Sequence, residues 1–345
     1  MNEDRKFLLK GRGFSRADTS QNKSAFRPWG TFPQRLKPTA CLPFTARLKA
    51  CPFKETHHEM QPIAASFKAG FAWYHRDQGD IVRILFVGDI FGRPGREIVR
   101  DHLADVVATR AIELVVANGE NAAAGFGLTP SLAEEFLALG IDVITSGNHV
   151  WDRREILDYF RSAERNGSNA RRVLRPANYP AGSPGLGWYE GQTRQGTPFA
   201  VINLQGRVFM VDNDDPFRTA DRLLESIRAK VILVDMHAEA TSEKIAMGWY
   251  LDGRVTAVLG THTHVPTADE RVLPKGTAYL TDVGMTGPYD SIIGVEKEQV
   301  LQRFLTNIPA RFEPATGDVR FSAVVIDCAP ESGRATSIER LVLRQ

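Results

Sequence analysis

Cysteine is scarce in this sequence of 345 residues, which contains Cys41, Cys51 and Cys328 and no C-x-x-C pair. An odd number of cysteines in this arrangement argues against a disulfide framework and fits a reducing cytoplasm. The sequence also lacks an apolar stretch long enough to cross a membrane. The only apolar run near the N-terminus, 7–9, is too short for the core of a signal peptide. We therefore expect a cytoplasmic protein without a membrane-spanning segment.

A strong excess of one charge is missing as well. The formal net charge is +2, and it is unevenly distributed. Residues 1–80 contain 14 Lys/Arg and 7 Asp/Glu, whereas the remaining residues contain 29 and 34. The basic surplus therefore belongs to the N-terminal segment, and the rest of the chain has no charge signature of a nucleic-acid-binding protein. The hydrophobic content of 43% is ordinary for a globular protein and excludes disorder throughout.

Residues 1–80 lack the hydrophobic periodicity of either helices or strands. Pro, Arg, Lys, Ser and Thr are scattered through this segment, and the pattern changes abruptly at residue 81. One interpretation is a disordered N-terminal extension. The other is that the segment is not part of the natural protein and that Val82 corresponds to a GTG start codon. In both cases we expect residues 81–345 to form the folded domain.

From residue 81 onwards, apolar runs typical of buried strands alternate with stretches typical of helices. The expected strands are 84–87, 114–117, 143–145, 199–202, 231–234 and 255–259, and the expected helices are 95–108, 130–139, 152–160, 216–229 and 242–250. This alternation predicts an α/β fold with a largely parallel sheet. Two further strands, 321–327 and 338–343, follow one another without a helix, which indicates a second sheet.

Five of the expected strands run into polar residues at their carboxyl ends. These residues are Asp89, Glu120 with Asn121, Asn148 with His149, His237, and His262 with His264. Because the carboxyl ends of parallel strands lie at one edge of a sheet, side chains far apart in sequence should converge there. Carboxylate, amide and imidazole groups are ligands for Mn, Fe or Zn. In an extended segment, His262 and His264 would face the same side, so that each could serve one metal of a two-metal phosphoryl-transfer site.

Each of these residues, taken alone, also has an ordinary structural explanation. Asp89 could cap a helix, and Asp152 is the better cap candidate for the helix after His149. Asn148 could be a turn residue, and a lone His237 would more often be a buried core histidine. The convergence of all five clusters at strand ends is much harder to explain in this way.

The order of these motifs resembles that of the calcineurin-like metallophosphoesterases, from Arg83 to about Leu343. That superfamily carries G-D-x-H, G-D/E, G-N-H-D/E, a lone His and G-H-x-H blocks. The matching segments here are Gly88-Asp89-Ile90-Phe91, Gly119-Glu120-Asn121, Gly147-Asn148-His149, His237 and Thr261-His262-Thr263-His264. Phe91 stands where the superfamily has a metal-binding His, and Glu120 replaces the bridging Asp. Both departures match one branch of the superfamily, the bacterial 2′,3′-cyclic-nucleotide phosphodiesterases. Segments 203–207 and 282–287 are also similar to that branch.

This resemblance implies a two-sheet sandwich flanked by helices, a four-layer αββα fold in which the late strands complete the second sheet. It also implies two metal ions, Fe or Mn. The expected ligands are Asp89, Glu120, Asn121 and His264 for one metal, and Glu120, Asn148, His237 and His262 for the other. Asn121 would fill the place left open by Phe91. His149 would protonate the leaving ribose oxygen, a task suited to a histidine near neutral pH.

The implied activity is hydrolysis of cyclic nucleotides of the 2′,3′-cyclic AMP type by a metal-bridging hydroxide. The substrate would then be a small-molecule phosphodiester. Two alternatives use the same site: a phosphomonoesterase or protein phosphatase, or a non-catalytic regulatory protein that retains the fold. A dinucleotide-binding oxidoreductase is disfavoured because Gly88, Gly92 and Gly95 form G-x-x-x-G-x-x-G rather than G-x-G-x-x-G. The sequence does not specify an oligomeric state, although this branch tends to form homo-oligomers.

Overall fold

The computed structural model describes residues 81–163 and 167–345. The expectation of a disordered or non-native extension at residues 1–80, and with it Cys41 and Cys51, lies outside the described residues. In the described part of the chain, no helix is long and apolar enough to cross a membrane.

The described residues form thirteen strands, six α-helices and one 3-10 helix. The strands are β1 (Val82–Val87), β2 (Asp89–Ile90), β3 (Leu114–Asn118), β4 (Val143–Thr145), β5 (Trp188–Gln192), β6 (Pro198–Gln205), β7 (Val231–His237), β8 (Ala257–Thr261), β9 (Arg271–Val272), β10 (Ala278–Leu280), β11 (Met285–Pro288), β12 (Val319–Cys328) and β13 (Ala335–Arg344). The helices are α1 (Gly92–Thr109), α2 (Pro130–Ala138), α3 (Ile156–Ser162), η1 (Asn169–Arg172), α4 (Pro216–Ser226), α5 (Thr241–Tyr250) and α6 (Lys297–Thr306).

The strands are divided between two sheets. The first has the order β2-β11-β12-β1-β3-β4, with β13 paired to β12. In it, β1, β3 and β4 are parallel, and β12 runs antiparallel to β1. The second has the order β5-β6-β7-β8-β10-β9, in which β6, β7, β8 and β10 are parallel. In each sheet, the carboxyl ends of the parallel strands therefore lie in a row along one edge.

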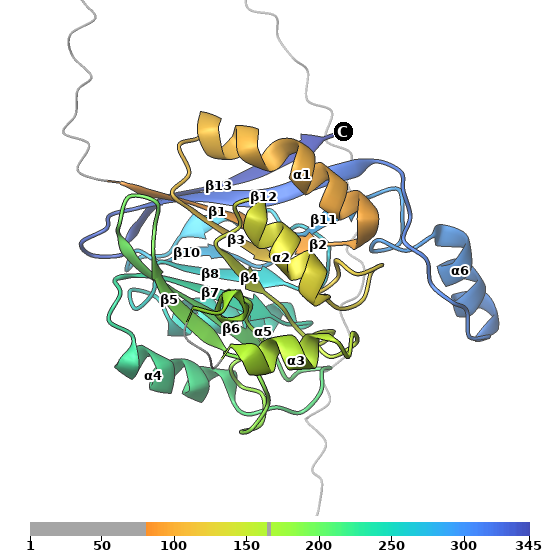
Figure 1. Cartoon of the computed structure of the whole chain (residues 1–345), viewed down its shortest axis with the longest axis horizontal. Coiled ribbons are helices and arrows are strands. Elements are labelled where there is room, and N and C mark those ends of the chain that lie inside the picture. The colour runs from red at the N-terminus through yellow and green to blue at the C-terminus, as the bar shows by residue number, and fades with distance from the viewer. Residues whose placement is uncertain (1–80, 164–166) are drawn as a thin grey trace, which may run out of the picture. The chain divides into compact units, whose positions relative to one another are not determined.

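The two sheets pack face to face, with helices on their outer faces. Along β1, Ile84 and Phe86 belong to the core between the sheets, whereas Leu85 and Val87 pack into the core beneath α1 and α2. A third core lies between the second sheet and helices α4 and α5. In Figure 1, α1 lies above the sheets and α4 below them. Strands covered on both faces read as continuous apolar runs, as these do. The expected two-sheet sandwich flanked by helices is confirmed.

The expectation that the late strands complete a separate sheet is wrong. β12 lies beside β1, with Val82 opposite Cys328, and β13 continues outward from β12. The physical reason is that β12 is itself buried on both faces: Phe321 and Val325 join the outer core, and Val324 joins the core between the sheets. Beside β1 it also satisfies backbone groups that a buried free edge would leave unpaired. The second sheet is built from β5 to β10 instead.

Candidate metal centre

The carboxyl ends of strands from both sheets meet at one place, and the two sheets contribute different donor atoms there. The first sheet supplies oxygen-bearing side chains: Asp89 in β2, Glu120 and Asn121 after β3, and Asn148 after β4. The second sheet supplies imidazoles: His237 at the end of β7, and His262 and His264 after β8. Asp89, Glu120 and His237 are completely buried. The structure thus brings together residues that lie up to 175 positions apart in the sequence.

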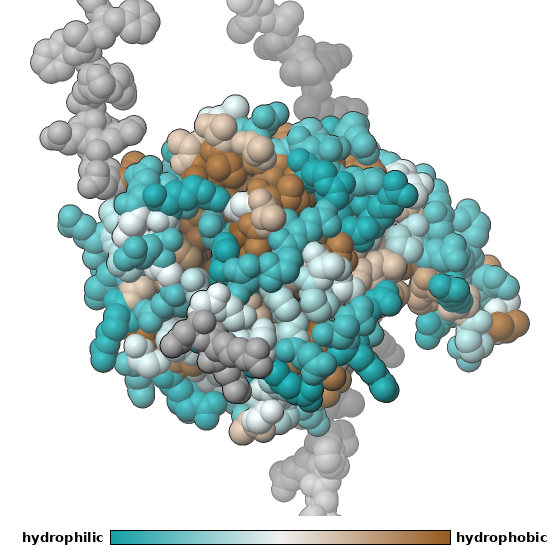
Figure 2. All heavy atoms as spheres, viewed as in Figure 1, coloured by the Kyte–Doolittle hydropathy of each residue, from teal (hydrophilic) through white to brown (hydrophobic). Residues whose placement is uncertain are grey.

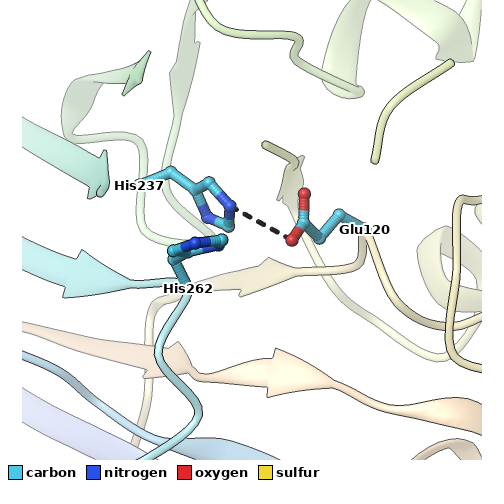
Figure 3. Close-up of side chains that lie close together, drawn as sticks. All are labelled: Glu120, His237 and His262. Carbon is cyan, nitrogen blue, oxygen red and sulfur yellow. Dashed lines mark ion pairs between the residues drawn. The ribbon is translucent and has the colours of Figure 1, made fainter. Parts of the chain in front are cut away.

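The centre of the cluster is formed by His237, which faces oxygen atoms from the opposite sheet (Figure 3). Its Nε2 atom lies 3.1 Å from Glu120 Oε1 and 3.0 Å from Asn148 Oδ1. Two oxygen acceptors around one ring nitrogen need either a hydrogen on that nitrogen or a metal ion between the three atoms. Burial lowers the pKa of His237, but the charge and hydrogen bond of Glu120 outweigh it and raise the pKa to about 9.

The other ring nitrogen of His237 is held by a buried hydrogen-bond network. Nδ1 lies 2.9 Å from Thr261 Oγ1, which donates to Asp235 Oδ1 at 2.7 Å. Asp235 also accepts from Thr145 Oγ1 at 2.5 Å and from Asn118 Nδ2 at 3.1 Å. Because the Thr261 hydroxyl already donates to Asp235, it accepts from His237 Nδ1–H. This arrangement fixes the ring so that Nε2 points into the cluster, as is usual behind histidines that bind metals.

Glu120 lies where the side chains from the first sheet meet those from the second sheet. Burial raises its pKa, but the charge and hydrogen bond of His237 have the larger combined effect and lower it to about 2. Its Oε1 also accepts from Asn121 Nδ2 at 3.2 Å, and its Oε2 accepts from the His149 backbone N–H at 3.2 Å. Glu120 is therefore an ionised buried carboxylate, and its Oε1 contacts residues from both sheets.

His262 and His264 approach the cluster from one loop. The His262 ring lies 4.7 Å from the His237 ring, between centroids, and burial together with the charge of His237 lowers the pKa of His262 to about 3. His264 Nδ1–H donates to the Ile293 carbonyl at 2.9 Å, so that its Nε2 presents a lone pair, 3.0 Å from Asn121 Nδ2. Burial lowers the pKa of His264 as well. Both shifts favour the neutral ring, the form in which imidazole binds metals.

The residues present fit a metal centre. Ligand atoms of Glu120, His237 and His262 lie within 4.8 Å of one another. Asp89 is buried with its Oδ1 atom unpartnered, while Oδ2 accepts from the His262 backbone N–H at 3.3 Å. Burial raises the pKa of Asp89 well above its usual range. A buried carboxylate oxygen without a donor is costly unless a cation neutralises it.

Phe91 packs against the cluster but offers it no ligand atom. Its ring stands edge-on to His264, with 5.5 Å between the centroids and an interplanar angle of 77°. The Asn121 side chain lies on the same side of the cluster, in contact with both Glu120 and His264. The amide is thus close to the place that Phe91 leaves without a ligand, and its role as a ligand stays a prediction.

The expectation that 262–264 is extended is wrong. Strand β8 ends at Thr261, and His262 and His264 have positive φ angles of 99° and 64°. Such angles are unfavourable for residues with a side chain and are found where the surroundings enforce them. The enforcing group is Asp282 Oδ2, which accepts from the Thr263 backbone N–H at 3.2 Å and from its Oγ1 at 2.7 Å. The buried Lys244 Nζ lies 2.6 Å from the same oxygen.

Gly147 meets a spatial requirement of the cluster that the sequence pattern alone does not predict. A Cβ atom at this position would lie 2.1 Å from the His237 ring and 2.5 Å from Glu120 Oε2. The backbone before Asn148 therefore passes directly over the two central groups, and only a glycine leaves room for them. The glycine immediately before Asn148 is the only sign of this requirement in the sequence, and a turn at Asn148 explains it equally well.

His149 lies outside the cluster, with its side chain about 30% exposed. Its Nδ1 atom lies 2.8 Å from Asp152 Oδ2, and its ring stands edge-on to Phe126 at 5.2 Å between centroids. The expectation that Asp152 caps the following helix is wrong, because α3 begins at Ile156 with Glu155 before it. The Asp152 carboxylate instead pairs with His149 Nδ1. Among the described residues, His149 Nε2 has no hydrogen-bond partner.

A cavity of about 600 Å³ opens beside the cluster. Glu120, Asn121, His149, His262 and His264 line its polar side. The rest of its lining is largely apolar and comes from the loop after β3, the loop after β8 and the segment around α6. The arrangement therefore combines a buried candidate metal cluster, an exposed histidine paired with a carboxylate, and space for a small molecule.

Comparison with known proteins identifies the group to which this chain belongs. The family model for YmdB-like proteins matches residues 85–341. The chain is 48% identical over 264 residues to a 2′,3′-cyclic-nucleotide 2′-phosphodiesterase from Bacillus subtilis, covering 76% of this chain and 97% of that protein.

Solved structures agree with this relationship. A hypothetical protein from Thermus thermophilus superimposes with a TM-score of 0.70 at 46% identity, over 76% of this chain and all of that one. A phosphatase from Mycoplasma pneumoniae superimposes with a TM-score of 0.71 at 31% identity, over 77% of this chain and 94% of that one. The chain therefore belongs to the YmdB-like protein family.

Proposed function

We propose that this chain is a metal-dependent phosphodiesterase that hydrolyses cyclic nucleotides, with the 2′,3′-cyclic AMP type as substrate. The observation that supports this most strongly is the position of His237 Nε2 between Glu120 and Asn148 oxygens in a buried cluster beside an open cavity. The choice of substrate is carried over from the Bacillus subtilis relative, which bears the name of such an enzyme.

Two metal ions are part of the proposal, with Fe or Mn as the expected elements. One would be held by Asp89, Glu120, Asn121 and His264, and the other by Glu120, Asn148, His237 and His262. Mixed oxygen and nitrogen donors of this kind suit both elements. When bound, the metals supply positive charge that polarises the phosphate and acidifies a water molecule. Glu120 would be shared between the two sets, because its Oε1 contacts Asn121 of one set and His237 of the other.

His149 is the residue that would handle the leaving group. In the hydrolysis, a water oxygen forms a bond to phosphorus, the bond from phosphorus to the ribose oxygen breaks, and that oxygen takes up a proton. Asp152 Oδ2 lies 2.8 Å from His149 Nδ1 and so orients the ring, which leaves Nε2–H as the proton donor to the leaving oxygen. Asn148 and His149 are adjacent, yet one side chain contacts His237 and the other lines the cavity.

The proposal also covers location and assembly. We place the protein in the cytoplasm, on the grounds of its cysteine pattern. A homo-oligomer is proposed from the resemblance to the cyclic-nucleotide phosphodiesterase branch.

A turnover screen tests the proposed function. Purified protein loaded with Mn or Fe would be given 2′,3′- and 3′,5′-cyclic nucleotides and a phosphomonoester, and metal content would be measured in parallel. A His237→Gln variant controls for contaminating enzymes. We expect hydrolysis of 2′,3′-cyclic nucleotides that disappears in the variant. Turnover of monoesters alone would favour a phosphatase, and metal-loaded protein without any turnover would favour a regulatory protein.

A further inference from the structure

The cavity beside the metal-ligand candidates has a wall that the proposed chemistry does not use. Phe126, Val265, Ile293 and Phe304 contribute apolar surface to it. Phe304 is 77% exposed and Val265 57% exposed, so that much of this surface is in contact with solvent. Phe304 belongs to α6, which stands apart from the sandwich at the right of Figure 1 and shows hydrophobic atoms in Figure 2. Apolar surface inside a cavity that also holds reactive groups is typical of a ligand subsite.

The groups along the cavity are arranged in an order that matches the parts of a nucleotide. Glu120 Oε2 accepts from the His149 backbone N–H at 3.2 Å, and the His149 ring stands against Phe126 at 5.2 Å between centroids. A phosphate at the Glu120 end would therefore place its leaving oxygen near His149. The group attached to that oxygen would then extend along Phe126 towards the apolar wall.

The charge of the cavity limits what can occupy it. Among the described residues that line it, Arg303 is the one lysine or arginine. Its guanidinium group lies 5.2 Å from the centre of the Phe312 ring, which holds it against the wall. Sites for several phosphates collect multiple cations. The cavity therefore suits a ligand with one phosphate and a planar, weakly polar remainder, and its volume of about 600 Å³ is appropriate for a single small ligand.

We infer that this apolar wall is a subsite for the nucleobase of a mononucleotide, with Phe126 and Phe304 as its aromatic contacts. The inference rests on the proposed function for the position of the phosphate. Aromatic side chains bind bases through their π-faces, which all four bases share. The subsite therefore contributes affinity for nucleosides over base-free phosphodiesters, with little preference among bases.

Two cyclic phosphodiesters that differ in the base test this assignment. Adenosine 2′,3′-cyclic phosphate and methyl β-D-ribofuranoside 2,3-cyclic phosphate share the ribose and the cyclic phosphate, but only the first carries a base. We expect Phe304→Ala to lower the ratio of kcat/KM for the adenosine substrate over the methyl riboside substrate by roughly tenfold to a hundredfold. The matched control is Leu305→Ala on the same helix, because Leu305 is 83% exposed and does not line the cavity. This control should keep the wild-type ratio.

Direct binding separates a failure of the subsite from a failure of the proposed function. Adenosine binding to wild-type protein and to Phe304→Ala would be measured by calorimetry, without any turnover. Weaker binding by the variant supports the subsite even if wild-type protein hydrolyses no cyclic phosphodiester, an outcome that would defeat the proposed function alone. Equal kcat/KM values for the two substrates in wild-type protein, or equal adenosine binding by both proteins, would overturn the subsite.

Discussion

At the scale of single residues, the polar side chains that converge at the strand ends are easier to predict than the groups that orient them. Asp89, Glu120 and His237 were identified because they follow apolar runs, which is a local signal. Asp235 and Thr261, which hold the His237 ring, also follow apolar runs, but nothing in the sequence marks them as orienting groups. Their role depends on the pairing of β7 with β8 and on contacts with the other sheet, and the sequence does not show which strands will face each other.

His149 provides a prediction at this scale. His149→Ala should keep its metals but lose roughly 10²–10⁴-fold in turnover of a substrate with a ribose leaving group, because a ribose alkoxide needs a proton to depart. With a nitrophenyl ester the loss should be much smaller, since that leaving group departs without a proton. Asp152→Asn should show a weaker form of the same pattern, because the pairing at Nδ1 is retained without its charge.

Metal analysis and both substrates would be applied to the same preparations of these variants. Equal losses on the two substrates would contradict the role as general acid. Loss of a metal from His149→Ala would make this residue a ligand instead.

At the scale of elements, the eight strands expected from apolar runs are all present, and the helices begin within four residues of their expected starts. Short strands such as β2 and β11 were missed because two to four residues carry too little periodicity to identify them. The two sheets themselves were expected, but the assignment of each strand to its sheet was not, since β3 and β7 are equally apolar and only long-range pairing separates them. The left-handed backbone at His262 and His264 could not be predicted, because Asp282, which holds it, lies about 20 residues further along the chain.

The contact between Thr263 and Asp282 leads to a prediction for this loop. Thr263→Val removes the hydroxyl that donates to Asp282 Oδ2 at 2.7 Å. The strained backbone at the two flanking histidines then loses part of its support, so that we expect metal affinity to fall roughly tenfold or more. Thr263→Ser keeps the hydroxyl and should behave like wild type. Metal titration against a fluorescent chelator measures the affinity, and identical affinities for the Val and Ser variants would contradict the prediction.

At the scale of the whole molecule, the buried thiol of Cys328 reports on the integrity of the sandwich. It lies at the end of β12, opposite Val82 in β1, and burial raises its pKa to about 12. The reactive thiolate is therefore rare at pH 8, on the order of one molecule in ten thousand. We expect iodoacetamide to label the peptide containing Cys328 only in denaturing urea, as followed by mass spectrometry. Rapid labelling without denaturant would show that β12 opens on its own.

The N-terminal segment leads to a second prediction at this scale. A chain that begins at Val82, the first residue of β1, retains every described strand and helix. We therefore expect it to fold, with an unfolding temperature and turnover close to those of the full chain. Loss of solubility or of turnover on truncation would assign residues 1–80 to the working protein.

The division of donor atoms between the two sheets has a mechanical consequence. Oxygen donors stand on one sheet and imidazoles on the other, so a metal bound as proposed would fasten the two halves of the sandwich together. A slight slide of one sheet over the other would pull the two kinds of donor apart before it opened any cavity in the core. The affinity for metal would therefore fall when the two sheets shift relative to each other. In return, a metal present at a hundredfold excess over its dissociation constant would raise the free energy of unfolding by about 2.7 kcal/mol.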